Sequence, residues 1–238
     1  MIIDPWPAFT GRQGVPAHST HPYMSTVSMM MYDPTTFALF FIASWALILT
    51  PGPDMLYVIT RGISQGRRAG LHSAFGVTLG ILVHTLFAAF GLAALIQTSA
   101  IAFLVIKTIG AAYLIYLGIK TFRNKTGFEG DERQPLAPQA IFWQGFMSNV
   151  TNPKISIFFL AFLPQFVHPE RGSFFIQMLT LGLLFALFGV AFLSVVGSFA
   201  GQIGGWFAKK PGVVNRFHWL TGGVLIGLGV RLAFFERG

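Results

Sequence analysis

The sequence predicts an all-α integral membrane protein of six transmembrane helices, arranged as two inverted three-helix repeats with broken first and fourth helices. Three observations support this fold class. The chain of 238 residues is 53% hydrophobic and only 10% charged, whereas a soluble globular protein carries about 25% charged residues. It contains six long apolar stretches. Proline interrupts two of these stretches at corresponding positions.

Composition also limits the function classes. Basic residues outnumber acidic ones by 16 to 8, but they lie mostly in short connectors between apolar stretches. A nucleic-acid-binding protein would gather them on one polar face, so no nucleic-acid partner is expected. Cysteine is absent, which excludes disulfides, thiolate metal sites and thiol redox chemistry. No metal site is expected.

The first 36 residues differ from the remainder of the chain. They are rich in Pro, Ser, Thr and His and contain no apolar core of signal-peptide length. We expect a disordered tail at 1–36, and whether part of it reflects the choice of start codon stays open, because Met24, Met29, Met30 and Met31 are alternative starts.

The transporter domain is expected at 37–235. A span needs roughly 20 predominantly apolar residues, and the predicted spans are 37–60, 71–96, 100–121, 141–166, 174–203 and 217–235. The second and third are separated only by "QTSA", which predicts a tight hairpin. The polar connector 123–139 separates repeat one (37–122) from repeat two (140–235) and is expected to act as a hinge between them.

The distribution of basic residues predicts the orientation. The connectors after span one, between the halves and before span six hold ten basic residues: Arg61, Arg67, Arg68, Lys120, Arg123, Lys125, Arg133, Lys209, Lys210 and Arg216. The opposite side holds four: Arg12, Arg171, Arg231 and Arg237. Basic connectors face the cytoplasm, so both termini are expected outside a cell inner (plasma) membrane that the chain crosses several times.

The two halves resemble each other at three landmarks in the same order. "TPGP" at 50–53 matches "TNPK" at 151–154, "TLGIL" at 78–82 matches "TLGLL" at 180–184, and "AAYLIYLGIK" at 111–120 matches "GGVLIGLGVR" at 222–231. Each half contains an odd number of spans, so the halves must insert with opposite topology. Inverted repeats around broken helices are a transporter design that holds substrate near the midplane.

The breaks involve Thr50, Pro51, Gly52 and Pro53 in span one, and Thr151 and Pro153 in span four. At 1.5 Å per residue they lie about 15 to 20 Å deep, near the middle of a hydrocarbon core about 30 Å thick. Lipid cannot satisfy the freed backbone groups, which must face protein or a wet cavity. We therefore expect a polar site at mid-membrane, although a proline kink that serves packing alone is the alternative.

Asp54 follows the first break and Lys154 closes the second. Ionisable residues inside a membrane are costly and commonly functional. The two have opposite charge at nearly equivalent repeat positions, which predicts that they lie close together. They could recognise the ammonium and carboxylate of a zwitterion, with Asp54 also taking up a proton. The alternative is a static structural ion pair.

Other polar side chains are weaker candidates. Asn149 and Asn152 flank the second break and could bind a ligand or cap the half-helices. His84 could relay protons or act only as a hydrogen-bonded packing residue. Three pairs of glycines spaced four apart are predicted to make close helix contacts: Gly76 and Gly80, Gly197 and Gly201, and Gly223 and Gly227.

At these residues the chain resembles the lysine exporter (LysE/RhtB) family of amino-acid efflux proteins, over roughly residues 33–235. The resemblance rests on "LTPGPDML" in the first span, "GLHSAFGVTLGILVH" in the second, "GAAYLIYLGIKTF" in the third and "GFMSNVTNPKISIFF" in the fourth. It implies a secondary transporter, not an enzyme, that exports amino acids or close derivatives, such as homoserine, threonine, compounds like homoserine lactone, or other neutral amino acids. It also implies protons as the exchanged partner and no cofactor.

Several alternatives stay open beside this interpretation. The chain could export basic amino acids or cations, although one Asp, one Lys and one His within the spans suit a zwitterion better than a bare cation. A second acidic residue at mid-membrane would favour lysine or arginine, so its absence from the spans favours neutral amino acids. A non-transport membrane scaffold is a further alternative, and the sequence leaves a homo-oligomer open.

Overall fold

A computed structural model of the chain describes residues 34–98, 100–123, 135–203 and 211–234. The described residues confirm the all-helical class, since their regular elements are helices and none is a strand. The expected tail through residue 33, and residues 124–134 of the expected hinge, lie outside the described residues.

The first apolar stretch forms two helices, α1 (Pro34–Leu49) and α2 (Pro53–Gln65), bent by 51° at the break between them. Helix α1 begins three residues before the expected span, and proline is favoured at the first position of a helix because its missing N–H is not needed there. Helix α2 continues beyond the expected end at residue 60 and stops at Gly66, whose φ of 81° suits glycine.

Arg61 therefore lies inside α2 and is 4% exposed. The prediction that it belongs to a basic connector was wrong. The apolar run ends before Arg61, but the helix does not, because its polar residues form hydrogen bonds to α5 and to the chain just before it. Arg67 and Arg68 are exposed at the start of α3, as expected for connector residues.

Two long helices complete the first half. They are α3 (Arg67–Thr98) and α4 (Ala100–Arg123), and α4 starts two residues after α3 ends. Helix α3 packs against α5 and α7, whereas α4 packs mainly against α9.

The fourth apolar stretch is also broken. Helix α5 (Pro138–Val150) is followed after two residues by α6 (Pro153–Ile157), which continues as a wider π-helical turn, η1 (Phe158–Phe162), and a 3₁₀ turn, η2 (Leu163–Phe166). The short turn η3 (Pro169–Arg171) leads to α7 (Phe174–Ser198), and α9 (Pro211–Phe234) ends the described chain.

Not every helix meets a length and hydropathy criterion for crossing a membrane. Within the described ranges, α3, α4 and α7 contain such stretches, and the bent pair α1 and α2 adds a fourth if it counts as one span. Pro153–Phe166 and His218–Phe234 are shorter apolar helices. The structure thus supports a multi-pass membrane protein, and the six-span count remains a prediction.

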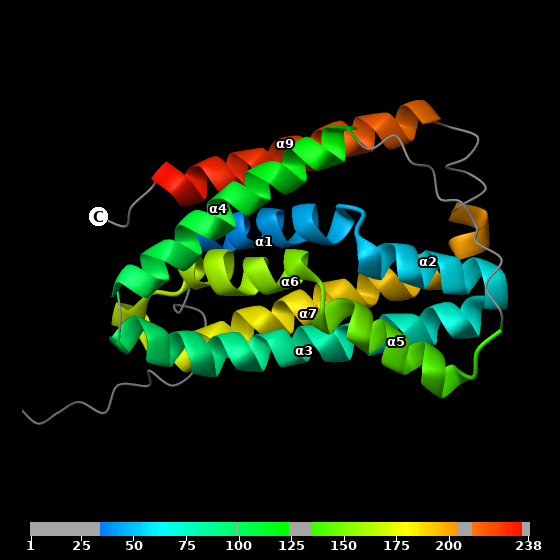
Figure 1. The fold of residues 1–238 in the computed structure, drawn as a ribbon, viewed down its shortest axis with the longest axis horizontal. Helices are drawn as coiled ribbons and strands as arrows, with labels where there is room; N and C mark the ends of the chain where they lie inside the picture. The colour runs from blue at the N-terminus through cyan, green and yellow to red at the C-terminus, as the bar shows by residue number, and fades with distance from the viewer. Residues whose placement is uncertain (1–33, 99, 124–134, 204–210, 235–238) are drawn as a thin grey trace, which may run out of the picture. The chain divides into compact units, whose positions relative to one another are not determined.

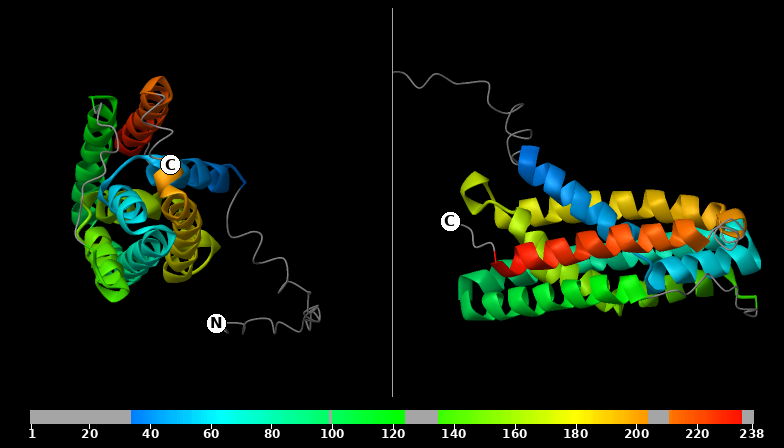
Figure 2. Two further views of the ribbon diagram at one scale, coloured as in Figure 1. Left: turned by 90° about the vertical axis from the view of Figure 1, so that its right-hand side faces the viewer. Right: turned by 90° about the horizontal axis from the view of Figure 1, so that it is seen from above.

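Figures 1 and 2 show how the helices of residues 34–234 run relative to one another. Helix α2 ends, and α3 and α5 begin, at one end of the bundle, on the right of Figure 1. Because Arg67 and Arg68 lie there, we name it the basic end. Helix α1 starts, and α3 ends, at the opposite end. The two helix breaks lie between these ends.

Helices α4 and α9 meet through reciprocal glycine contacts. A Cβ added at Gly118 would lie 2.6 Å from Ile226 Cγ1 and 2.7 Å from the Gly222 carbonyl oxygen. One added at Gly229 would lie 2.7 Å from Ile115 Cγ1 and 2.9 Å from the Ala111 carbonyl oxygen. Each residue of the first contact has its counterpart 111 positions away in the second, so the contact is nearly the same when the two helices are exchanged.

The predicted glycine pairs are correct in part. Gly76 and Gly80 lie against α5, and Gly197 lies against Gly70. A Cβ added at Gly201 or Gly227 would have no neighbouring atom within 4 Å, and one added at Gly223 would lie 4.0 Å from Phe122 Cζ. Because α9 turns Gly222 and Gly229 toward α4, the prediction for Gly223 and Gly227 was wrong.

We expect Gly118→Ala to destabilise the protein and Gly227→Ala to leave it unchanged or slightly more stable. The first methyl group would overpack the α4–α9 contact, at a cost of about 1–3 kcal/mol. The second would enter open space and add helix propensity of up to about 1 kcal/mol. Thermal or denaturant unfolding in detergent micelles measures both, and equal stability of the two variants would contradict the contact.

Candidate substrate and proton site

Asp54 receives hydrogen bonds from three side chains across the bundle. It occupies the second position of α2, directly after Pro53, and is 6% exposed. Its Oδ2 accepts from Asn149 Nδ2 and from Asn152 Nδ2, each at 2.8 Å, and its Oδ1 accepts from Ser148 Oγ at 3.2 Å. A carboxylate is also favoured at the N-terminus of a helix, where the helix dipole is positive.

Lys154 occupies the same position in α6, directly after Pro153, and is also 6% exposed. Its ammonium donates to the carbonyl oxygens of Thr50 at 2.9 Å and Leu47 at 3.2 Å. These carbonyls lie at the C-terminal end of α1, where the helix dipole favours a cation. The charged residue after each break thus makes its contacts with the other broken helix.

Proline explains why these carbonyls need an external donor. In an uninterrupted helix the Leu47 carbonyl would accept from the N–H of residue 51, and the Asn149 carbonyl from that of residue 153. Both positions are proline, which has no N–H. Lys154 donates to the Leu47 carbonyl. The Asn149 carbonyl has two donors, His84 Nε2 at 3.1 Å and the Asn152 backbone N–H at 2.9 Å.

His84 therefore has an identifiable bonding role. Its Nε2 faces a carbonyl oxygen, which can only accept, so Nε2 carries the proton. The ring also lies 6.1 Å from that of Phe159, centroid to centroid. The geometry agrees with the hydrogen-bonded packing alternative, and a relay of protons by His84 stays a prediction.

Asn152 connects the two charged residues. Its Oδ1 accepts from the Lys154 backbone N–H at 3.0 Å and so caps α6, while its Nδ2 donates to Asp54. Asp54 and Lys154 make no direct hydrogen bond or ion pair with each other in the described part of the chain; all their polar contacts are those given above. The static ion pair considered from the sequence is therefore not formed.

Two glycines make room for these side chains. A Cβ at Gly52 would lie 2.9 Å from Lys154 Nζ, although the extended backbone there (φ −155°, ψ 179°) accepts any residue. A Cβ at Gly80 would lie 2.6 Å from Asn149 Oδ1. This Oδ1 is buried and has no hydrogen-bond partner among the described residues.

The structure thus brings all five predicted polar residues into one network: Asp54, Lys154, Asn152, Asn149 and His84. The predicted break residues also lie where expected, since α1 ends before Thr50, α5 ends before Thr151, and Pro53 and Pro153 begin the helices that follow. Sequence reasoning missed Ser148, because a serine in an apolar span is common, and it missed buried Arg61.

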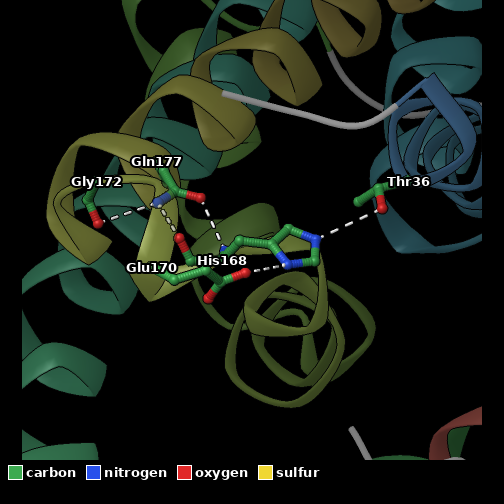
Figure 3. Close-up of polar contacts among 5 residues, drawn as sticks. All are labelled: Thr36, His168, Glu170, Gly172 and Gln177. Atoms are coloured by element: carbon green, nitrogen blue, oxygen red, sulfur yellow. Dashed lines mark hydrogen bonds and ion pairs between the residues drawn. The ribbon is translucent and has the colours of Figure 1, made fainter. Parts of the chain in front are cut away.

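A second polar cluster lies near the start of α1, at the end of the bundle opposite the basic end. Figure 3 shows its five residues: Thr36, His168, Glu170, Gly172 and Gln177. His168 Nδ1 lies 3.0 Å from Glu170 Oε1, and His168 Nε2 lies 3.5 Å from Thr36 Oγ1 on α1. The Gln177 side chain holds the backbone N–H and carbonyl of His168 and the Gly172 carbonyl. These contacts attach the connection before α7 to the start of α1.

Comparison with known proteins identifies related sequences. A family model described as "LysE type translocator" matches residues 45–235. A "Leucine efflux protein" of Salmonella choleraesuis is 32% identical over 198 residues, which cover 80% of this chain and 91% of that protein.

Two other relatives have names that state no substrate. A membrane protein of Vibrio cholerae is 32% identical over 186 residues, covering 78% of this chain and 90% of its own. One of Bacillus subtilis is 31% identical over 198 residues, covering 78% and 92%. No solved structure gives a significant match.

We expect Gly52→Ala to displace the Lys154 ammonium from the α1 carbonyls. The added methyl group meets the end of a flexible side chain, so the fold should survive with a loss of about 1–3 kcal/mol, the range for hydrogen bonds to a charged group. In a Lys154→Ala background, Gly52→Ala should lower the free energy of unfolding only slightly, because the ammonium that it displaces is absent. Denaturant unfolding of the four proteins gives the coupling energy, and an equal cost in both backgrounds would show that Gly52 is not needed for Lys154.

Proposed function

Because the chain belongs to the LysE type translocator family, a family of transporters and not of enzymes, we propose that it exports a neutral amino acid in exchange for protons. Residues 45–235, which match the family model, include both helix breaks and every residue of the candidate site. Support for the substrate class comes from the relative named leucine efflux protein. L-Leucine is therefore our first candidate substrate.

In this proposal the two breaks recognise the two charges that all α-amino acids share. Asp54 binds the substrate ammonium, and Lys154 binds the substrate carboxylate. Both are now held by neutral groups, namely amides and a hydroxyl around Asp54 and carbonyls around Lys154. In the present hydrogen bonds only one partner is charged, and exchange of the neutral partner for an oppositely charged substrate group gives a stronger bond. Because the carboxylate and the ammonium form no ion pair with each other, each is available for its own substrate group.

Asp54 is also proposed to carry the coupling proton. A protonated carboxyl group needs an acceptor for its O–H, and buried Asn149 Oδ1 is an acceptor oxygen in the residue that already contacts Asp54. Rotation of the Asn149 amide would turn this oxygen toward Asp54. Proton binding would weaken the attraction of Asp54 for an ammonium group, so substrate and proton would compete for one carboxyl group.

We further propose that the two halves are inverted three-span repeats, six spans in all, that alternate about the site. Several observations support a two-fold relation: Pro53 and Pro153 open corresponding helices, each charge contacts the other broken helix, and the α4–α9 glycine contact is reciprocal. Isologous contacts of this kind arise when two like units pack about a two-fold axis. In this arrangement the basic end faces the cytoplasm of a cell with the protein in its inner membrane.

We expect Asp54→Asn and Lys154→Gln to impair transport in different ways. In proteoliposomes, Asp54→Asn should abolish the acceleration of L-leucine movement by a pH gradient while some leucine exchange remains. Lys154→Gln should raise the half-saturating leucine concentration roughly tenfold or more, the effect of a lost hydrogen bond to a charge. Radiolabelled leucine measures both, and Lys120→Gln, at the exposed end of α4, is the control.

The double variant tests whether the two charges have more than a structural role. The carboxylate and the ammonium contact different groups, so removal of both charges should not restore proton-coupled transport, even where stability recovers. Unfolding in detergent must first establish that each variant is folded. Full recovery of pH-driven leucine export in the double variant would rule out our assignment, and export of divalent cations without any amino acid by the unaltered protein would contradict the proposed function.

A further inference from the structure

A row of polar contacts joins α2 to α5 between the candidate site and the basic end. We name these residues the polar seam: Asp54, Tyr57, Arg61 and Gln65 on α2, and Gln144 and Ser148 on α5. The α2 residues recur every three or four positions, so they share one face of that helix. Asp54 contacts Ser148, Tyr57 and Arg61 both contact Gln144, and Gln65 contacts the backbone of Leu136 just before α5.

On the other side of the candidate site, aromatic rings lie between the helix breaks and the polar cluster around His168. Phe40 of α1 packs edge-on against Phe166, with ring centroids 5.6 Å apart, and Phe158 lies 4.9 Å from Phe185 of α7. All four rings are at most 2% exposed. A zwitterion would lose its hydration among these rings, whereas hydroxyl, amide and guanidinium groups of the polar seam can replace water molecules. The polar seam is therefore the better route to Asp54 in this conformation.

Arg61 is the basic residue of the polar seam. Its Nη1 donates to Gln65 Oε1 at 3.0 Å, its Nη2 donates to Gln144 Oε1 at 3.2 Å, and its guanidinium lies 5.7 Å from the centroid of the Tyr57 ring. A buried guanidinium in a membrane protein is costly and commonly functional. Its planar set of N–H donors matches a carboxylate, which can replace an amide oxygen and make a stronger bond.

Position determines what Arg61 could recognise. It lies seven residues beyond Asp54 on α2, which is about 10 Å along the helix axis. Lys154 shares Asn152 with Asp54, whereas Arg61 contacts Gln144 and Gln65, nearer the basic end. We therefore assign the final carboxylate contact beside Asp54 to Lys154 and an earlier contact to Arg61.

We propose that Arg61 is a carboxylate-binding station on the entry route from the basic end, which an amino acid occupies before it moves to Asp54 and Lys154. This proposal rests on the proposed function and adds a second recognition site to it. The substrate carboxylate takes the place of the Gln144 oxygen on Arg61, and Gln144 keeps its contact with Tyr57. Substrates without a free carboxylate lose this step.

The experiment measures L-leucine transport from each side of proteoliposomes with one known protein orientation. A C-terminal tag that is accessible or inaccessible to antibody reports the orientation. Arg61→Gln should raise the half-saturating leucine concentration about tenfold or more when leucine enters at the basic end, with little change when it enters at the opposite end. Arg61→Lys, which keeps the charge but not the planar fork, should have an intermediate effect. Arg67→Gln, which removes an exposed charge at the same end, is the matched control.

A second readout separates recognition from a structural role. Leucine amide keeps the ammonium and side chain but has no carboxylate, so the unaltered protein should prefer leucine at the basic end and Arg61→Gln should lose much of that preference. The proposal for Arg61 would be overturned if Arg61→Gln changed the half-saturating leucine concentration equally from both sides. It would also be overturned if folded Arg61→Gln and Arg61→Lys kept the unaltered preference for leucine over leucine amide. If the unaltered protein moved no amino acid, the proposed function itself would fail, and the station with it.

Discussion

The absence of two backbone donors in the middle of the bundle governs the architecture of the candidate site. Pro51 and Pro153 each lie four residues after a carbonyl, of Leu47 and Asn149, that an ordinary helix would satisfy internally. A membrane interior offers no water to replace those donors. The donors come from Lys154 and from His84 with the Asn152 backbone. The breaks thus require polar side chains at the centre of an apolar bundle, and the helices around them must approach closely enough to deliver those side chains.

Glycine provides the close approach. Gly52 leaves space for the Lys154 ammonium, and Gly80 lets α3 lie directly against the Asn149 side chain. Farther away, Gly118 and Gly229 bring α4 and α9 together through matching contacts. In the inverted-repeat arrangement that we propose, these contacts would allow the two halves to pivot about the breaks while each charge stays within reach of the opposite half. Transport would then consist of repeated exchange between protein partners and substrate partners at Asp54 and Lys154.

Much of the candidate site could be predicted from the sequence, because proline and charge are rare in apolar spans and therefore conspicuous. This identified both breaks, Asp54, Lys154, the two asparagines and His84. The contacts between them could not be predicted, since which groups meet depends on how each helix is rotated. Rotation also decides that Gly222 and Gly229, and not Gly223 and Gly227, face α4. Arg61 was missed because a basic residue just after an apolar run usually belongs to a connector, whereas α2 continues and buries it against α5.

The most direct test of the site is whether an amino acid protects it from chemical modification. The chain contains no cysteine, so Ser148→Cys places a single thiol next to Asp54. In detergent-solubilised protein, a water-soluble methanethiosulfonate reagent should label this thiol, and L-leucine should slow the labelling in a saturable manner. A cysteine at exposed Arg67 should react at the same rate with and without leucine. Labelling of the Ser148→Cys thiol at a rate that no amino acid changes would contradict binding of substrate at the helix breaks.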